Sequence, residues 1–444
     1  MRIIIVGFDG LDYYRVLKYL DYLPTFKRLK NFMGRLESTI PPSTAPAWVS
    51  MFTGVTPGEH GIYGFINIET RKVMNYNDIK AKKLWDRLKD VRFCIINVPM
   101  TYPPDKDING LIVSGFPTYV NDLRKIVYPP RWLPILKKIK LPKDIDEVEF
   151  RRKYYKNREA AFRNLLSLMD LRARSYLKLL SFKEFDIFWF VFRETDIIQH
   201  FYRDEKKIVE TYKKADEILS KFLIKAKEDW LIVVSDHGHN TVERVIYVDN
   251  LIKTYICKYS CDRGIFDKLI KPLIINRVIS LIWKYPLLID FATKVFGNRE
   301  IIKTSFEGII YNSDSWSLNV DDEELRDKII QFLSNIKDKK GKKLFLKVLR
   351  GKELYKNAKV RLPDIFFLPN YGFYPLSGSK FGRSDIIDIP RDPSHHGTHT
   401  LNGIYLLYNR NASKIPLGKE AKIWEIAKMI TSLEFCEKEE LRND

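Results

Sequence analysis

The chain has 444 residues, 45% of them hydrophobic, which suits one large α/β domain with insertions or two to three smaller domains. Its formal net charge of +20 favours an anionic partner (nucleic acid, anionic lipid or a phosphorylated small molecule), and its 30% charged residues are also typical of a thermophile's surface. The apolar runs are too short to span a bilayer, the four cysteines do not resemble a disulfide framework, and no signal peptide is recognisable, so we expect a cytoplasmic protein.

The first predicted element is a buried strand within "RIIIVGFDG", residues 2–10. Apolar runs of the same design, each ending in polar residues, follow at 93–104, 110–116, 185–196, 230–238 and 403–409. Helical patterns separate them, for example at 13–32 and 207–227. Continuous apolar runs indicate strands that are covered on both faces, and their alternation with helices predicts a doubly wound, mostly parallel α/β sheet. Ligands of such sheets bind at the carboxyl ends of the strands.

Two segments interrupt this alternation. Residues 118–182 and 258–302 are basic and helical in pattern. We expect both to be insertions that form a cap over the active-site edge of a single domain spanning residues 1–444. A third region, 323–358, is predicted to begin with a charged helix.

The histidines are not scattered along the chain. All 7 lie in short motifs: His60 in "PGEHGIYG", His200 in "ETDIIQH", His237 and His239 in "SDHGH", and His395, His396 and His399 in "SHHGTHTLNG". Asp196 and His200 are four residues apart, so a helix would place both on one face. Asp9, and Asp236 with His237, follow two predicted strands at the same sheet edge. A single acid there could be only a helix cap, but carboxylates and imidazoles gathered together suit zinc or a similar divalent ion.

A nucleophile for such a site could come from "PPSTAPAWVSMFTG", residues 41–54. Ser43 and Thr44 lie just before a predicted helix, where free backbone N–H groups favour an anion. A hydroxyl bound to a metal ion loses its proton more easily and can attack phosphorus. Ser or Thr before a helix is most often only an N-cap, so the residues by themselves leave the role of this hydroxyl open.

Taken together, the motifs resemble a known family. "FDG", "STAPAW" followed by "TGVTPGEHGIYGF", "VPMTYPP", "ETDIIQHFY", "SDHGH" and "GTHTLNGIYLLY" are similar to motifs of the type I phosphodiesterase and nucleotide pyrophosphatase branch of the alkaline phosphatase superfamily, and they occur in the family's order. The resemblance implies an alkaline-phosphatase-like fold with two divalent metal ions, zinc or alternatively manganese, on one side of the sheet.

The resemblance also implies which residues bind these ions. One ion would be held by Asp196, His200 and His399, the last matched through its spacing to Gly403; the other would be held by Asp9, Thr44, Asp236 and His237. We expect His239 to be local support or solvent-facing. For His60, His395 and His396 we expect structural positions, or positions that support the ligands.

The implied reaction is hydrolysis of a phosphodiester or a nucleotide-type pyrophosphate through a phosphothreonine. In this branch the nucleophile is usually a threonine before x-Pro, which matches Thr44 and makes Ser43 the runner-up. Nucleotide-hydrolysing relatives usually have an asparagine where this chain has Phe65, with Asn67 two residues on, so nucleotide specificity stays open. A sulfatase would need an arginine where Trp48 stands, and we set that activity aside.

Two alternatives accompany this hypothesis. A related transferase would pass the phosphoryl-linked group to a glycan or lipid, and the basic segment 258–302 would allow peripheral contact with an anionic membrane. A basic nucleic-acid-binding protein without catalysis is disfavoured, because no helix-turn-helix, zinc-finger or RNP-type signature is present. The expected partner is therefore a phosphorylated small-molecule substrate.

Overall fold

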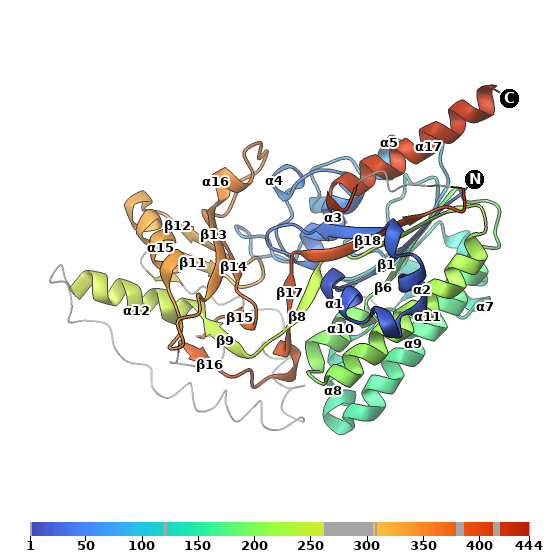
Figure 1. Cartoon of the computed structure of the whole chain (residues 1–444). Coiled ribbons are helices and arrows are strands. Elements are labelled where there is room, and N and C mark those ends of the chain that lie inside the picture. Colours follow the sequence, from blue (N-terminus) through green and yellow to red (C-terminus); the bar gives the residue numbers. More distant parts are fainter. Residues whose placement is uncertain are drawn as a thin grey trace.

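The computed structural model describes residues 2–118, 122–261, 305–306, 309–378, 386–411 and 418–443. Within them, a nine-stranded sheet has the order β19-β2-β18-β7-β1-β6-β3-β4-β5 (Figure 1). Its strands are β1 (Ile3–Phe8), β2 (Met33–Glu37), β3 (Phe93–Ile96), β4 (Gly110–Val113), β5 (Val127–Tyr128), β6 (Ile187–Phe192), β7 (Trp230–Val234), β18 (Asn402–Tyr408) and β19 (Glu420–Lys422). All six strands predicted from the sequence are present in it.

The pairing of the strands is mostly parallel, as predicted. β1 lies between β6 and β7 and runs parallel to both, and β3 runs parallel to β6 and β4. β18 is antiparallel to both of its neighbours, β7 and β2. The centre of the sheet is therefore a parallel core whose strands end at one edge.

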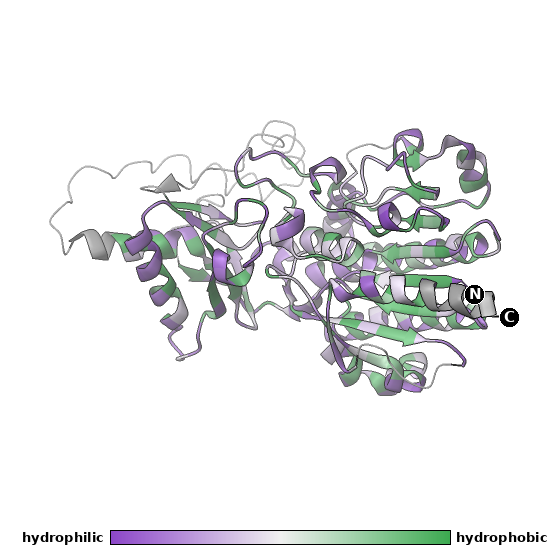
Figure 2. Cartoon of the chain, turned by 90° about the horizontal axis from the view of Figure 1, so that it is seen from above, coloured by the Kyte–Doolittle hydropathy of each residue, from purple (hydrophilic) through white to green (hydrophobic). Residues whose placement is uncertain are grey.

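Alternate side chains of the central strands fill two hydrophobic layers. Ile4, Val6 and Phe8 of β1 pack in the layer shared with α9 (Arg158–Leu179) and α11 (Glu205–Ala226). Ile3 and Ile5 pack on the other face with α3 (Thr44–Thr53) and α17 (Glu425–Asn443). Figure 1 shows these two pairs of helices on opposite sides of the sheet, and Figure 2 shows the strands between them as hydrophobic. Coverage on both faces explains why the strands are continuously apolar.

The predicted helices agree with the structure in part. α11 covers the helical pattern at 207–227. The pattern at 13–32 is instead divided into α1 (Tyr13–Lys18), α2 (Pro24–Arg28) and two short 3-10 turns. Pro24 has no N–H group to continue a helix from the preceding turn, so it begins a new one. No helix within the described residues combines the length and apolarity that a membrane span requires.

The segment 118–182 contains α6 (Leu123–Ile126), β5, α7 (Leu133–Lys138), α8 (Glu147–Lys156) and α9. β5 joins the edge of the large sheet, and α9 packs on one face of it. α8 contacts α9 and lies near the ends of the central strands. Of the second expected insertion, residues 262–302 lie outside the described residues. The cap formed by the two insertions stays a prediction.

A second lobe lies beside the large sheet (Figure 1). In the described part of the chain it contains a five-stranded antiparallel sheet and a three-stranded sheet. Their strands are β10 (Ser305–Phe306), β11 (Ile309–Asn312), β12 (Ser317–Val320), β13 (Phe345–Arg350), β14 (Ile365–Pro369), β9 (Arg244–Tyr247), β15 (Phe373–Leu376) and β16 (Ile387–Asp388). α12 (Val248–Cys261) and α15 (Glu323–Asn335) accompany them, and α15 is the predicted charged helix. The lobe has its own core, which includes Ile246, Leu318 and Phe367.

Candidate active site

The candidate site residues follow three central strands, β1, β6 and β7, at the same edge of the sheet. Gly7 of β1 is in register with Val191 of β6 and Val234 of β7, so the three strands end level with one another. Asp9 directly follows β1, α10 (Glu194–Phe201) follows β6, and Asp236 with His237 follows β7. The prediction that these residues meet at the carboxyl edge of the sheet agrees with this geometry.

One donor cluster surrounds the carboxylate of Asp196. Its Oδ1 atom lies 3.4 Å from the Nε2 atoms of His200, His239 and His399. α10 places Asp196 and His200 on one face, as expected for residues four apart. The Nε2 atoms of His200 and His399 are only 2.9 Å apart. Four donors that converge on so small a volume could hold a metal ion.

His239 takes part in this cluster. It lies on β8 (Gly238–Thr241), directly opposite His399 on the antiparallel strand β17 (Gly397–Thr400). Its side chain is buried, and neither ring nitrogen has a hydrogen-bond partner among the described residues. The solvent-facing alternative for His239 is therefore wrong. The sequence signal was its spacing of two from His237, which places both on one face of an extended chain.

A second donor cluster contains Asp9, Asp236 and His237, each at most 1% exposed. Nε2 of His237 lies 3.5 Å from Oδ1 of Asp9 and 3.1 Å from Oδ2 of Asp236. The other carboxylate oxygens accept hydrogen bonds from the Trp48 indole and the Gly10 amide. The rings of His237 and His399 stack with centroids 3.7 Å apart, so the two clusters adjoin.

Burial and mutual repulsion act strongly on the carboxylates. Desolvation, together with the charges of Asp236 and Asp196, raises the pKa of Asp9 well above its usual value. Desolvation and the Asp196 charge do the same to the pKa of Asp236. Burial also opposes ionisation of Asp196, but His200, His239 and His399 outweigh it and hold that pKa well below its usual value.

The donors fit bound divalent cations. Within the described residues, Oδ1 of Asp9, Oδ2 of Asp236 and Oδ1 of Asp196 are buried without a hydrogen-bond partner. Buried carboxylates that lack donors are normally paired or coordinate a metal. Burial also lowers the pKa values of His200, His237 and His239, which keeps their imidazoles neutral, the form that binds metals. Mixed imidazole and carboxylate donors suit zinc, while manganese would accept the carboxylates.

Thr44 stands at the start of α3, beside the second cluster. Its hydroxyl oxygen lies 3.4 Å from Nε2 of His237, and its side chain is 7% exposed. Ser43 occupies the N-cap position, and its side chain makes no capping hydrogen bond. The first N–H groups of α3 have no partner within the helix, so this end of the helix favours an anion.

The remaining sequence candidates lie outside both clusters. His60 is buried at the end of α4 (Pro57–His60), with Nε2 2.9 Å from the Ser50 hydroxyl. The His396 amide donates to the backbone carbonyl of His200, and the His395 ring packs on Tyr374. Phe65 packs on Phe116, and the Asn67 side chain accepts hydrogen bonds from two amides of its own loop.

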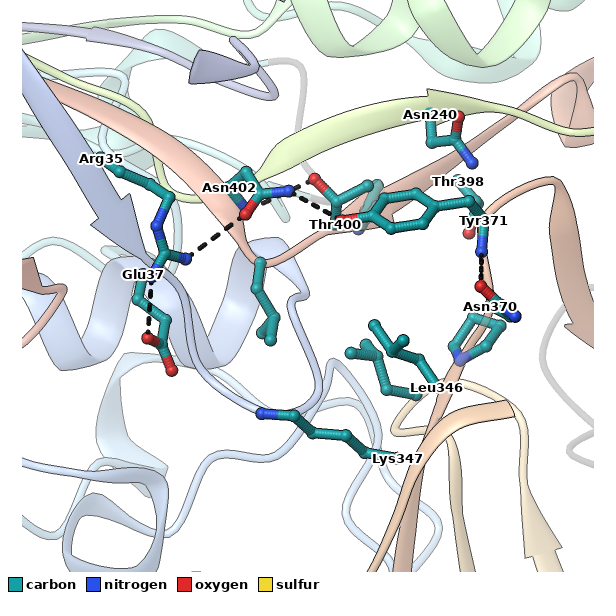
Figure 3. Close-up of a pocket in the computed structure, with 14 residues that line it drawn as sticks. Arg35, Glu37, Asn240, Leu346, Lys347, Asn370, Tyr371, Thr398, Thr400 and Asn402 are labelled. Carbon is teal, nitrogen blue, oxygen red and sulfur yellow. Dashed lines mark hydrogen bonds and ion pairs between the residues drawn. The ribbon is translucent and has the colours of Figure 1, made fainter. Parts of the chain in front are cut away.

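A cavity of about 230 Å³, lined by both polar and apolar side chains, lies on the other face of the ribbon formed by β8 and β17 (Figure 3). Side chains alternate along a strand, so Thr398 and Thr400 face away from the side to which His399 points. Arg35 donates to Asn402 and Glu37 at its wall, and Asn402 donates to Tyr371 of the second lobe. Residues of both lobes therefore line this cavity.

Comparison with known proteins adds a family match. The family described as "Type I phosphodiesterase / nucleotide pyrophosphatase" matches residues 3–402. No curated protein matches the sequence. Phosphonoacetate hydrolase from Sinorhizobium meliloti 1021, solved in complex with phosphonoformate, is similar in structure, with a TM-score of 0.59 and 14% identity over 97% of this chain and 95% of that chain.

Two further solved structures are similar over most of both chains. Murine ectonucleotide pyrophosphatase / phosphodiesterase 5 has a TM-score of 0.53 and 13% identity over 98% of this chain and 95% of that chain. The alkaline phosphatase PafA has a TM-score of 0.56 and 12% identity over 97% of this chain and 95% of that chain. At such identities the likeness shows the fold, and the predicted alkaline-phosphatase-like α/β fold is confirmed.

Proposed function

Because the chain belongs to the type I phosphodiesterase / nucleotide pyrophosphatase family, we propose that it is a metal-dependent phosphoesterase that hydrolyses a phosphodiester or pyrophosphate through a phosphothreonine at Thr44. Family membership supports phosphoester hydrolysis. The metal dependence and the covalent intermediate rest on one observation, the convergence of the Thr44 hydroxyl and two buried donor clusters at one edge of the sheet.

The two clusters would each hold one divalent ion. Asp196, His200 and His399 would bind the first, with His239 beside them, and Asp9, Thr44, Asp236 and His237 would bind the second. Bound ions would favour the alkoxide of the nucleophile and would neutralise charge that develops on the phosphoryl and leaving oxygens. Asp9 and Asp236 would then be ionised, because a cation removes the repulsion that raises their pKa values.

In this reaction the chain positions the substrate, and Thr44 forms and then loses a bond to phosphorus. Oγ1 of Thr44 forms a bond to phosphorus, the bond from phosphorus to the leaving oxygen breaks, and the threonine proton passes to solvent. The free N–H groups at the start of α3 would face the transferred phosphoryl group. Water then attacks phosphorus, the bond to Oγ1 breaks, the threonine hydroxyl is regenerated, and a phosphomonoester or phosphate leaves.

The test compares hydrolysis of a chromogenic phosphodiester and of the matching phosphomonoester, with zinc or manganese added, by the wild type and Thr44→Ala. Diester turnover that requires both the metal and Thr44 supports the proposal. Turnover that survives in a folded Thr44→Ala protein would exclude the phosphothreonine. Adding an alcohol to the reaction distinguishes a transferase from a hydrolase, because a transferase would form the alkyl ester in place of the hydrolysis product.

A further inference from the structure

A second cavity, of about 320 Å³, lies between the loop after α4 and the second lobe. Its lining includes Ile66 and Arg71 of the loop, together with Asn312, Ser315, Tyr374 and His395. We propose that this cavity is a subsite for a second anionic group of the substrate, a carboxylate or phosphate bound by Arg71. The inference rests on the proposed function, which accounts for the reacting phosphoryl group. It adds that the substrate also has a second anionic group.

Arg71 has hydrogen-bonding capacity that the described residues do not use. Its Nη1 atom donates to Oδ1 of Asn312 at 2.5 Å. Nε and Nη2 are buried, and neither has a hydrogen-bond partner in the described part of the chain. Burial lowers the pKa of the guanidinium, as expected for a cation without a counter-charge. Since Nε and one Nη form a planar fork, a carboxylate or phosphate can bind both donors with two oxygens.

The loop holds Arg71 in an uncommon backbone conformation. Residue 71 has φ +60°, in the left-handed region that non-glycine residues rarely adopt. The Asn67 side chain accepts from the amides of Glu69 and Thr70, and the Arg71 amide donates to the Asn67 carbonyl. These hydrogen bonds hold the turn in place and offset the free-energy cost of the left-handed backbone conformation at Arg71. Residues held in such conformations cluster at active sites and ligand clamps.

The cavity adjoins the first donor cluster. Its wall includes the rings of Tyr374 and His395, which pack with centroids 5.1 Å apart and planes tilted by 33°. The residue after His395 donates its amide to the carbonyl of His200, a donor of that cluster. Burial and the charges of Asp314 and Asp196 raise the pKa of Tyr374, so its hydroxyl stays protonated and able to donate.

One carboxylate also borders the cavity. Asp314 lines it, and its Oδ2 atom accepts the amide hydrogen of Ile66. An anion bound by Arg71 would therefore lie in the same cavity as a carboxylate whose Oδ2 atom is already hydrogen-bonded. The substrate predicted by this arrangement is a phosphodiester or pyrophosphate whose organic part carries its own carboxylate or phosphate.

The experiment measures binding by calorimetry to the metal-loaded protein. The probes are ω-carboxyalkyl phosphonates of increasing length and alkyl phosphonates of the same lengths, so each pair differs only in the carboxylate. The wild type is expected to bind the best-fitting carboxylated probe about tenfold to a hundredfold more tightly than its partner, the range for charge-assisted hydrogen bonds. Arg71→Met should abolish this preference, and Arg71→Lys should retain part of it.

The matched control is Arg361→Met. Arg361 is an exposed arginine that lies 3.5 Å from Glu69 of the same loop, and its removal should leave the preference unchanged. Equal binding of both probes by the wild type at every length, or an unchanged preference in Arg71→Met, would overturn the subsite.

Turnover of a p-nitrophenyl phosphodiester is measured on the same samples to separate the two proposals. Turnover without any carboxylate preference overturns the subsite and leaves the phosphoesterase standing. An Arg71-dependent preference without turnover supports the subsite and counts against the phosphoesterase.

Discussion

The hydroxyl of Thr44 lies 3.4 Å from Nε2 of His237, although 193 residues separate them in the sequence. The contact exists because α3 begins where β7 ends, above the centre of the sheet. A threonine that merely capped α3 would have no need of a buried histidine and two carboxylates beside it. The relationship therefore makes Thr44 the first residue to change.

Thr44→Ala should lower diester turnover by roughly a thousandfold or more, because the hydroxyl forms the covalent bond to phosphorus. Thr44→Ser should retain measurable turnover. Ser43→Ala should cost less than about tenfold, since its side chain makes no capping bond. Steady-state rates check these values, and intact mass after an acid quench shows whether a phosphoryl adduct forms. If Ser43→Ala lowers diester turnover more than Thr44→Ala does, the nucleophile is Ser43.

Removing the metal ions should destabilise the wild type, because Asp9 and Asp236 then repel each other in a buried site. An ion present at a hundred times its dissociation constant contributes about 2.7 kcal/mol. Asp236→Asn removes one of the repelling charges, so its melting temperature should fall less on chelation. Calorimetry with and without chelator measures this difference. Asp21→Asn, at an exposed carboxylate, is the control and should respond to chelation as the wild type does.

His239→Ala should weaken the ion at the Asp196 cluster by about 10-fold to 100-fold, the usual effect of losing a residue that orients or supplements the ligands. Affinity at the Asp9 cluster should change little. Titration with Co²⁺, followed by visible absorption, resolves the two sites because each donor set gives its own spectrum. His396→Gln is a suitable control outside the clusters. Two unchanged binding steps in His239→Ala would contradict a role for this imidazole.

The buried pair Arg172 and Glu194 should matter for stability, because the two side chains are 2% and 0% exposed. Arg172→Met leaves the Glu194 charge without its main partner and should cost about 3–5 kcal/mol in the free energy of unfolding. Replacing both residues with methionine should recover most of the loss. Urea unfolding measures each value. Arg163→Met, which breaks an exposed pair with Glu159, should cost less than about 1 kcal/mol.

His60 should make the folded state sensitive to acid. Burial lowers its pKa to about 3, below the value of 6.5 expected in the unfolded chain. Between these values the unfolded state binds a proton that the folded state does not, so this contribution to stability is complete above pH 6.5 and falls as the pH drops, by roughly 1.4 kcal/mol per unit. His60→Gln should lack this component. Unfolding free energies of both proteins from pH 7 to pH 4 should therefore converge, and parallel curves would contradict the prediction.

The sequence was most informative where burial is complete. The six predicted strands are recognisable because both faces are covered, which leaves uninterrupted runs such as "IFWFVF" in β6. β2, β5 and β19 were not predicted, because "MGRLE", "VY" and "EAK" are short or partly polar. Most strands of the second lobe were missed for the same reason, since they are very short or contain polar residues, as in "SLNV" of β12 and "FLKVLR" of β13. β14 was also missed, although its "IFFLP" is continuously apolar and buried.

Asp9, Asp196, His200, Asp236 and His237 could be predicted because they follow strands of the parallel core. His399 lies instead on β17, ahead of β18, and only the resemblance to the family indicated it. The prediction for His239 was less accurate, since its position opposite His399 depends on pairing between strands that are far apart in the sequence. Arg71 was missed altogether. In the sequence Arg71 looks like any other surface arginine. It is distinguished only by its Nε and Nη2 atoms, which are buried and have no hydrogen-bond partner among the described residues.

β8 and β17 pair with each other as a separate two-stranded ribbon. Thr241, the last residue of β8, is paired with Gly397, the first residue of β17. The chain therefore leaves for the second lobe and returns from it at neighbouring positions, while every donor of both clusters lies outside the excursion. Domain insertions are tolerated at such adjacent points. The second lobe is thus an exchangeable module: a different lobe could be grafted at these two positions while the part of the chain that carries both donor clusters stays unchanged.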